Sequence, residues 1–484
     1  MRTAAIMLSA SVGLAAATAA APPGAAPDAA GHASGAAASA PGTAASAPGT
    51  AANPTATAAN PTATAVNPPA AAAYAPATAS APPAASCADR SLFGLVRAGR
   101  HGRELARIGR RTLRPRPSPP VRLPAGVYGW SWDFSPACDA VAFAGRRGRI
   151  FLLDLDRGRH MGTVRIGGSA ATGQIAWPQP DRLVALSGDY RSPRVVTVSI
   201  PDGRIVATHR LPKGGHTSET TSLGLVILST PNNRIGSAIL ALATPDGGMR
   251  RVPLRRIRAG YDSGPRGGLL GRQLTPAVTV DEAGGRVYVI AANEPLVADV
   301  DLTSGAVAYH SLRGGGDPAP QATAAKGLAY GAFRSARWVG DATIAVSGEV
   351  TRMRRDWRRA QRRGQSPVRI DPYGLRLIRV DSWRVTTLHP LLRWFTLAGD
   401  ALLGMDSVPA GQHVSKATGL LAWTTDGSRR FTRFRGERGW IWGASWPYAY
   451  VRAVGPRRTH VVDVRTGRTV SKSRERRPPL LLVR

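Results

Sequence analysis

One short sequence pattern recurs along most of this chain and limits the folds open to it. The clearest copy, from Ala277 to Leu312, reads AVTVDEAGGRVYVIAANEPLVADVDLTSGAVAYHSL. It contains four apolar runs of strand length, separated by the turn DEAGG, the connection ANEP and the turn LTSG. The same order recurs over residues 130–166, 175–211 and 441–470. A four-stranded unit that repeats every ~40 to 60 residues indicates a β-propeller.

Two of these copies carry a family resemblance. FSPACDAVAFA, which begins at Phe134, and RVYVIAANEPLVADVDLTSGAVAYH, which begins at Arg286, resemble the YVTN-type and WD-type propeller repeats of secreted bacterial proteins. The resemblance extends over most of residues 92–472 and implies a propeller fold. It implies no activity and no site residue, because such repeats define blades rather than binding sites.

The number of blades follows from the first tight turn of each unit. These turns fall near seven positions: Pro136, Pro180, Ser222, Ala283, Gly340, Gly399 and Pro447. A partial unit spans residues 92–115, and the apolar C-terminal segment PPLLLVR is suited to supply its missing strand and so close the ring. We therefore predict an all-β fold with seven or eight four-stranded antiparallel blades.

The N-terminal residues predict export and a tether. Arg2 precedes an apolar run from Ala4 to Ala17 and Ala-x-Ala sites that end at Ala21, which is the pattern of a secretory signal peptide over residues 1–21. Residues 22–86 consist almost wholly of Ala, Pro, Thr, Ser, Gly and Asn, so we expect a disordered linker. The propeller domain then covers residues 87–484. We expect a monomeric protein, secreted or associated with the cell envelope, with no transmembrane segment.

The chain has two cysteines, Cys87 and Cys138. In an oxidising compartment a lone pair of cysteines favours a disulfide, which would join the first blade to the second. Cys87 also lies too far from the signal peptide to be a lipid-anchored cysteine.

Charge indicates the class of partner. The formal net charge is +34, from 64 lysines and arginines against 30 acidic residues, and nearly all the positive charge is arginine. Such an excess attracts anionic polymers, with a strength that falls as salt rises. Because export disfavours nucleic acid, an anionic polymer of the cell envelope or a protein partner comes first.

The candidate binding residues lie in loops that open on one face of a propeller. These are the loops between second and third strands and the loops between blades. The segment TRMRRDWRRAQRRGQ, at 351–365, predicts a short amphipathic helix with Met353, Trp357 and Ala360 on one side. Arginine forks bind phosphate, sulfate or carboxylate, and a tryptophan ring stacks on a sugar or base. The candidate ligand-binding residues are Arg146, Arg147, Arg354, Arg355, Trp357, Arg358, Arg359, Arg457 and Arg458.

Two alternatives remain at this point. The first is an evenly basic, merely soluble surface, because turns on the other face also carry arginines, at Arg157, Arg159, Arg204, Arg429, Arg430, Arg465 and Arg468. The second alternative is a lyase, a lactonase or a quinone-dependent dehydrogenase with a site at the channel mouth. The sequence has no recognisable catalytic, metal-binding or cofactor-binding motif. Asp154, Asp299, Asp301 and Asp463, which precede Gly turns, are expected to cap those turns.

Overall fold

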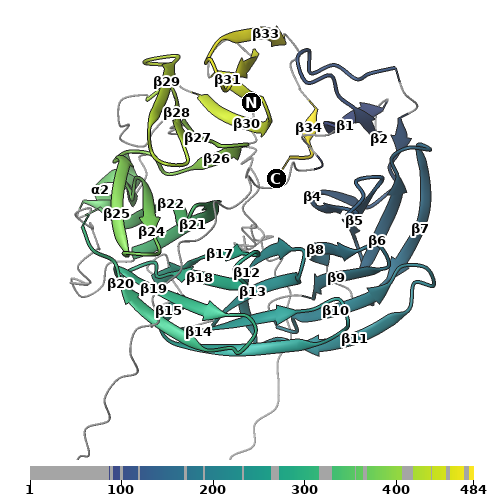
Figure 1. Ribbon diagram of the computed structural model, residues 1–484, viewed down its shortest axis with the longest axis horizontal. Helices are drawn as coiled ribbons and strands as arrows, with labels where there is room; N and C mark the ends of the chain where they lie inside the picture. The colour runs from purple at the N-terminus through teal and green to yellow at the C-terminus, as the bar shows by residue number, and fades with distance from the viewer. Residues whose placement is uncertain are drawn as a thin grey trace, which may run out of the picture. The chain divides into compact units, whose positions relative to one another are not determined.

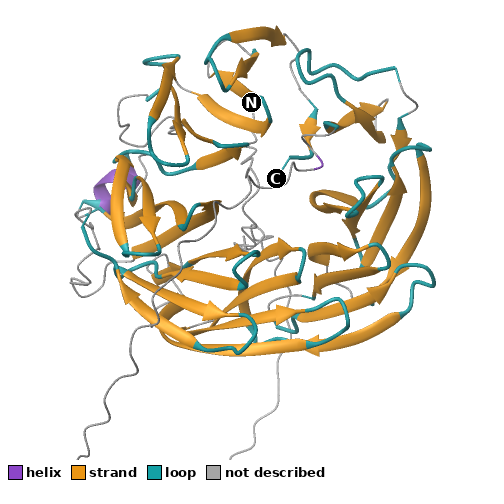
Figure 2. Ribbon diagram, in the orientation of Figure 1, coloured by secondary structure: helices purple, strands orange, loops and turns teal. Residues whose placement is uncertain are grey.

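The structure is a computed structural model, and almost every described residue belongs to a strand or a turn between strands (Figure 2). It describes residues 87, 91–98, 102–117, 120–167, 172–188, 191–231, 234–262, 272–314, 330–354, 356–363, 368–405, 418–437, 439–453, 458–473 and 479–483. The predicted signal peptide and linker lie outside these residues. No helix in the described ranges is long and apolar enough to cross a membrane.

Among the described residues, six sheets have four antiparallel strands each. The first contains β1 (Phe93–Ala98), β2 (Gly102–Arg107), β3 (Val121–Arg122) and β34 (Leu480–Leu481). The next two contain β4 (Val127–Phe134), β5 (Ala140–Gly145), β6 (Arg149–Asp154) and β7 (Arg159–Arg165), then β8 (Thr172–Gln179), β9 (Arg182–Ser187), β10 (Arg194–Ser199) and β11 (Ile205–Arg210). The fourth contains β17 (Ala277–Asp281), β18 (Arg286–Ile290), β19 (Leu296–Asp301) and β20 (Val307–Ser311). The last two contain β26 (Phe395–Ala398), β27 (Ala401–Met405), β28 (Leu420–Thr424) and β29 (Arg429–Arg433), then β30 (Gly439–Ser445), β31 (Tyr448–Ala453), β32 (Thr459–Asp463) and β33 (Thr469–Ser473).

The remaining described strands form one ten-stranded sheet. It contains β12 (Gly214–Thr221), β13 (Gly224–Pro231), β14 (Arg234–Ala243), β15 (Met249–Asp262), β16 (Arg272–Thr275), β21 (Tyr330–Gly340), β22 (Thr343–Met353), β23 (Val368–Pro372), β24 (Leu375–Arg379) and β25 (Arg384–His389).

A propeller of four-stranded antiparallel blades is therefore confirmed, but the predicted count of seven or eight is wrong. The described residues form six separate four-stranded blades. The number is lower than predicted because of β16. This strand pairs antiparallel with β15 and parallel with β21, and so fuses two predicted units into one sheet. β15 is 14 residues long and reaches this bridge because it extends well past the usual strand length.

The predicted ring closure is present. β34, near the C-terminus, pairs antiparallel with β1 through Gly94 and Leu481, and the two strands lie side by side in Figure 1. The amide of Leu482 also donates a 2.9 Å hydrogen bond to the carbonyl of Phe93. Tyr450 of β31 packs with Ala106 of β2 and with Leu481, so the last complete blade shares a core with the first. Closure of this kind covers the inner edge of β1 at Gly94 and Leu95.

Apolar residues from neighbouring sheets build the core. In β6, for example, Ile150 and Leu152 pack with Ile175 of β8 and Leu183 of β9. Similar clusters join the other successive units, because inner strands with both faces covered are apolar at consecutive positions. Two tryptophans of first strands, Trp132 and Trp177, are buried in clusters of this kind.

Side chains on innermost strands also join neighbouring units by hydrogen bonds. The carboxylate of Asp133 in β4 accepts a 2.8 Å bond from the amide of Trp177 in β8. At the equivalent place, the Thr279 hydroxyl of β17 accepts a 2.7 Å bond from the amide of Trp338 in β21. Each bond satisfies a backbone donor that would otherwise be buried without a partner.

Candidate basic-edge binding site

Successive turns of each sheet lie alternately at two edges, because the strands are antiparallel. The turns between first and second strands and between third and fourth strands form one edge, which we call the capped edge. The turns between second and third strands and the connections between sheets form the other, which we call the basic edge. Short connections, such as Leu211–Lys213 between β11 and β12, place the end of one sheet beside the start of the next, so that the basic edges of successive sheets lie next to each other.

Carboxylates gather on the capped edge, where they hold turns. Asp154 accepts bonds from the amides of Asp156 and Arg157, and Asp301 does the same for Thr303 and Ser304. These backbone hydrogen bonds hold the pKa of both carboxyls below the usual value. Asp463 also caps its turn, as predicted. The prediction for Asp299 is wrong, because both of its oxygens are instead bound by Arg286, at 2.8 and 3.0 Å.

Most arginines predicted on this edge have an acidic partner beside them. Arg157 and Arg159 lie 3.5 and 3.8 Å from the carboxylate of Asp154. Arg204 pairs with Asp202, Arg430 with Asp400 and Arg465 with Asp463. Arg429 instead lies over the ring of Trp423, and Arg468 is exposed. The capped edge therefore carries arginines and carboxylates together, and its charges largely offset each other.

The basic edge has the opposite composition. The described carboxylates near it are Glu104, Asp262, Glu294, Glu349, Asp356, Asp371 and Glu437. Its exposed cations are Arg97, Arg103, Arg122, Arg146, Arg147, Arg165, Arg191, Arg210, Lys213, Arg234, Arg258, Arg352, Arg358, Arg359, Arg362, Arg363, Arg433, Arg435, Arg458 and Lys472. Among the described residues, the net positive charge is thus larger at the basic edge, where few carboxylates offset the arginines. The expectation of an evenly basic surface does not describe this distribution.

The arginine-rich insert forms a hairpin topped by a short helix. β23 returns along the end of β22, with Arg352 opposite Arg369, and α2 (Trp357–Arg362) lies between them. Ala360 is buried, Trp357 is half-buried, and Arg358 and Arg359 are exposed, as the amphipathic pattern predicts. The side chain of Met353, together with Arg355 and Arg457, lies outside the described residues.

Within this insert, two of the predicted binding residues have local partners. Two nitrogens of the Arg354 guanidinium, Nε and Nη2, donate to the carboxylate of Asp356 at 3.0 and 3.2 Å and hold the pKa of that carboxyl below its usual value. Arg358 lies over the ring of Trp357, with 5.3 Å between the guanidinium carbon and the ring centre. Arg354 is therefore partly neutralised, whereas Arg358 keeps its charge available for a ligand.

The turn that presents Arg146 and Arg147 is fixed by glycine. Gly148 has φ of +60°, and a β-carbon there would lie 2.2 Å from the carbonyl oxygen of Gly167. Arg147 also has positive φ, at 57°, as tight two-residue hairpin turns require. Both arginine side chains are exposed, as is Arg458 on the turn between β31 and β32. The structure places these residues and α2 on the basic edge.

A buried arginine cluster near α2 was not predicted from the sequence. The guanidinium carbons of Arg334 and Arg376 lie 3.6 and 4.2 Å from the ring centre of Tyr373. Arg393 binds the carboxylate of Glu349 at 3.3 Å, and the side chain of Arg393 is only 8% exposed. The only sequence signal was arginine within apolar runs, as in LRLIR and LLRW. Such arginines usually face solvent, so the signal is weak.

His216 lies at the basic-edge end of β12. Its Nδ1 is 3.0 Å from the hydroxyl of Ser229, while its Nε2 is buried and has no hydrogen-bond partner. Burial lowers the pKa of His216 to about 4. The imidazole is therefore neutral in the folded protein at pH 7.

Acid should selectively destabilise the fold through His216. The imidazole of His216 takes up a proton near pH 6.5 in the unfolded chain and near pH 4 in the folded chain. The stabilising contribution of the neutral imidazole is therefore fully present above pH 6.5 and is lost as the pH falls toward 4. The loss amounts to about 3 kcal/mol by pH 4. Urea unfolding at pH 7 and pH 4.5 should show that His216→Gln removes part of the acid sensitivity. The same change at exposed His160 should leave it intact; equal curves for all three proteins would contradict the prediction.

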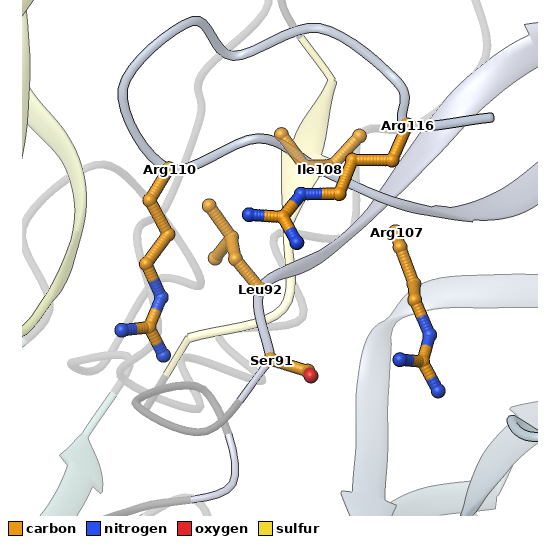
Figure 3. A pocket seen from close by; sticks show the side chains of 6 residues that line it. All are labelled: Ser91, Leu92, Arg107, Ile108, Arg110 and Arg116. Carbon is orange, nitrogen blue, oxygen red and sulfur yellow. The ribbon is translucent and has the colours of Figure 1, made fainter. Parts of the chain in front are cut away.

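The capped edge has a small arginine-lined cavity between β1 and the turn after β2. Figure 3 shows Arg107, Arg110 and Arg116 around Leu92 and Ile108. Its volume of about 30 Å³ is far below that of a ligand pocket. Arg107 is bound to Asp156 at 2.9 Å, and Arg110 donates to the carbonyl of Trp446 at 3.2 Å. The arginines that line this cavity therefore hold neighbouring elements of the fold together, and the cavity is too small to bind a polymer.

The enzyme alternative predicts a cluster of carboxylates or histidines. Within the described ranges, no three His, Cys, Asp or Glu side chains are grouped as metal ligands would be. Of the carboxylates near α2, Glu349 is bound by Arg393 and Asp371 lies 3.3 Å from Arg352. Both acids therefore pair with arginines: Glu349 with one on the connection between β25 and β26, and Asp371 with one on β22.

Comparisons with known proteins add little to the fold. No protein-family model matches the sequence, and no curated protein sequence matches it. One similar structure is the dihydro-heme d1 dehydrogenase NirN in complex with DHE, at 13% identity and TM-score 0.46, covering 80% of this chain and 74% of that one. Another is the Cps50 (Swd1) β-propeller domain of Myceliophteria thermophila, at 11% identity and TM-score 0.34, covering 72% and 95%. The computationally designed Ika8 protein has 9% identity and TM-score 0.37, covering 75% and 92%.

Proposed function

We propose that this propeller is a binding module that engages an anionic polymer through its basic edge, outside the cytoplasm. The observation that carries the proposal is the segregation of charge. Carboxylates are used on the capped edge to hold turns and pair with arginines, whereas exposed arginines of the basic edge mostly face solvent. A surface of one sign attracts an extended anion over its whole length. The export pattern and the disulfide support a location in an oxidising compartment.

The four-residue variant Arg146→Ser, Arg147→Ser, Arg358→Ser, Arg359→Ser should weaken binding to polyphosphate by about tenfold or more in 50 mM NaCl. It should also reduce the slope of log Kd against log salt, because fewer counterions are released on binding. The measurement is fluorescence anisotropy of labelled polyphosphate at several salt concentrations. Circular dichroism and melting temperature establish that the variant is folded.

A matched control separates edge-specific binding from general charge. Arg157→Ser, Arg159→Ser, Arg204→Ser and Arg468→Ser together remove the same charge from the capped edge. This control should retain wild-type affinity within about twofold, since the charges that it removes lie away from the proposed site. Equal weakening of both variants, or wild-type binding that ignores salt, would overturn the proposal.

A further inference from the structure

The basic edge also presents flat aromatic surface. Among the described residues, the exposed aromatic side chains are Tyr261, 42% exposed, and Trp394, 37% exposed. Tyr261 is at the basic-edge end of β15, and Trp394 is in the connection between β25 and β26 at the same edge. Of the exposed aliphatic residues, Met161, Ile205, Val206 and Val470 lie on outermost strands, Leu223 lies in the turn between β12 and β13, and Leu391 lies in the same connection as Trp394. Exposed rings thus coincide with the concentrated positive charge.

Trp394 is held in place by its surroundings. Its ring lies 5.2 Å from that of Phe333 on β21, at an interplanar angle of 47°. The preceding residue, Arg393, is buried and bound to Glu349, and Leu392 before it is fully buried. The segment 392–394 therefore buries the side chains of Leu392 and Arg393 and exposes that of Trp394. A fixed ring loses little conformational entropy when a ligand stacks on it.

The buried arginine cluster is linked through β21 and β22 to the platform that Trp394 and Phe333 form. Phe333 is adjacent to Arg334 in β21 and opposite Glu349 in β22. Three guanidinium groups, of Arg334, Arg376 and Arg393, are buried there beside one described carboxylate, that of Glu349. Arginine stays charged when buried, and salt screens a buried charge less than an exposed one. The platform therefore favours a ligand that has both a ring and a negative charge.

We propose that the polymer is an acidic polysaccharide and that Trp394, supported by Phe333, stacks against one of its sugar rings. This inference rests on the proposed function and names its ligand class. The apolar face of a sugar suits the indole surface, while the carboxylate or sulfate of the same sugar is attracted by the positive charge of the basic edge. Nucleic acid has rings and charge as well. The Cys87–Cys138 disulfide favours the polysaccharide, because disulfides persist in extracytoplasmic compartments where such polymers occur.

The test compares polymers with and without rings. Trp394→Ala should weaken polygalacturonate binding by about tenfold and leave polyphosphate binding unchanged. Trp394→Leu, which keeps apolar bulk but has no flat ring, should behave like Trp394→Ala. Leu391→Ala is the matched control, since Leu391 is equally exposed in the same connection. Polygalacturonate should also change wild-type tryptophan fluorescence, and this change should shrink in both Trp394 variants.

The outcomes separate this inference from the proposed function. If neither polymer binds wild-type protein, the proposed function fails. If both bind and the Trp394 variants lose neither or lose both equally, only the stacking inference fails. Single-stranded oligo(dT) is the third probe: tighter binding than polygalacturonate, with loss in Trp394→Ala, would assign the platform to nucleobases and overturn the polysaccharide.

Discussion

Removal of residues 479–484 should leave the propeller without a stable folded state. Leu482 is fully buried and Leu481 is 6% exposed, so each contributes about 1.5–3 kcal/mol through burial. The deletion also exposes β1 as an inner edge strand and removes the 2.9 Å bond from the indole of Trp442 to the carbonyl of Pro479. Domains are stable by only about 5–15 kcal/mol, so these losses are comparable with the total. Soluble yield and thermal unfolding measure the effect.

A point variant shows whether burial or strand pairing dominates. Leu482→Ala keeps the backbone of the closing segment and should cost about 2–5 kcal/mol, with a folded protein remaining. The deletion should be clearly worse, because it also removes the pairing of β34 with β1. A deletion protein that melts at the wild-type temperature would show that the ring does not depend on this closure.

Local patterns predicted much of the fold. The alternation of apolar runs and turns located the four-stranded units, and the apolar C-terminal segment indicated the closing strand. The fused sheet could not be predicted in this way, because it depends on non-local pairing. Tyr261 lies opposite Gln273, and Gln273 lies opposite Gly331, far along the chain. β16 has four residues, too few for a periodic signal.

The candidate site was predicted less completely. Arg146, Arg147 and the arginines of the insert were predicted because loop positions and turn glycines can be recognised from the local sequence. The segregation of acids was also present in the sequence, since Asp before Gly turns marks the capped edge. The arginine cluster was missed because burial of Arg334 depends on Tyr373, which is distant in sequence. Trp394 was missed because its exposure depends on the burial of Leu392 and Arg393 beside it.

Loss of the Cys87–Cys138 disulfide should lower the free energy of unfolding by about 4 kcal/mol. The bond closes a loop of 51 residues, and the chain-entropy relation for such a loop gives this value. It joins the segment before β1 to the turn between β4 and β5, where the Ser135 hydroxyl binds Asp139 at 2.6 Å. Cys87 also packs against the core shared by the first two sheets. The bond therefore adds a covalent link to the same sheet that β34 closes.

Urea unfolding measures this effect, with and without reductant. Cys87→Ser with Cys138→Ser should unfold at the same urea concentration in both conditions, and reduced wild-type protein should match it. Oxidised wild-type protein should require more urea. If reductant leaves the wild-type curve unchanged while thiol labelling confirms reduction, the bond does not stabilise the fold. If the double variant is far less stable than reduced wild type, the half-buried cysteine side chains contribute through packing, since the two proteins equally lack the covalent link.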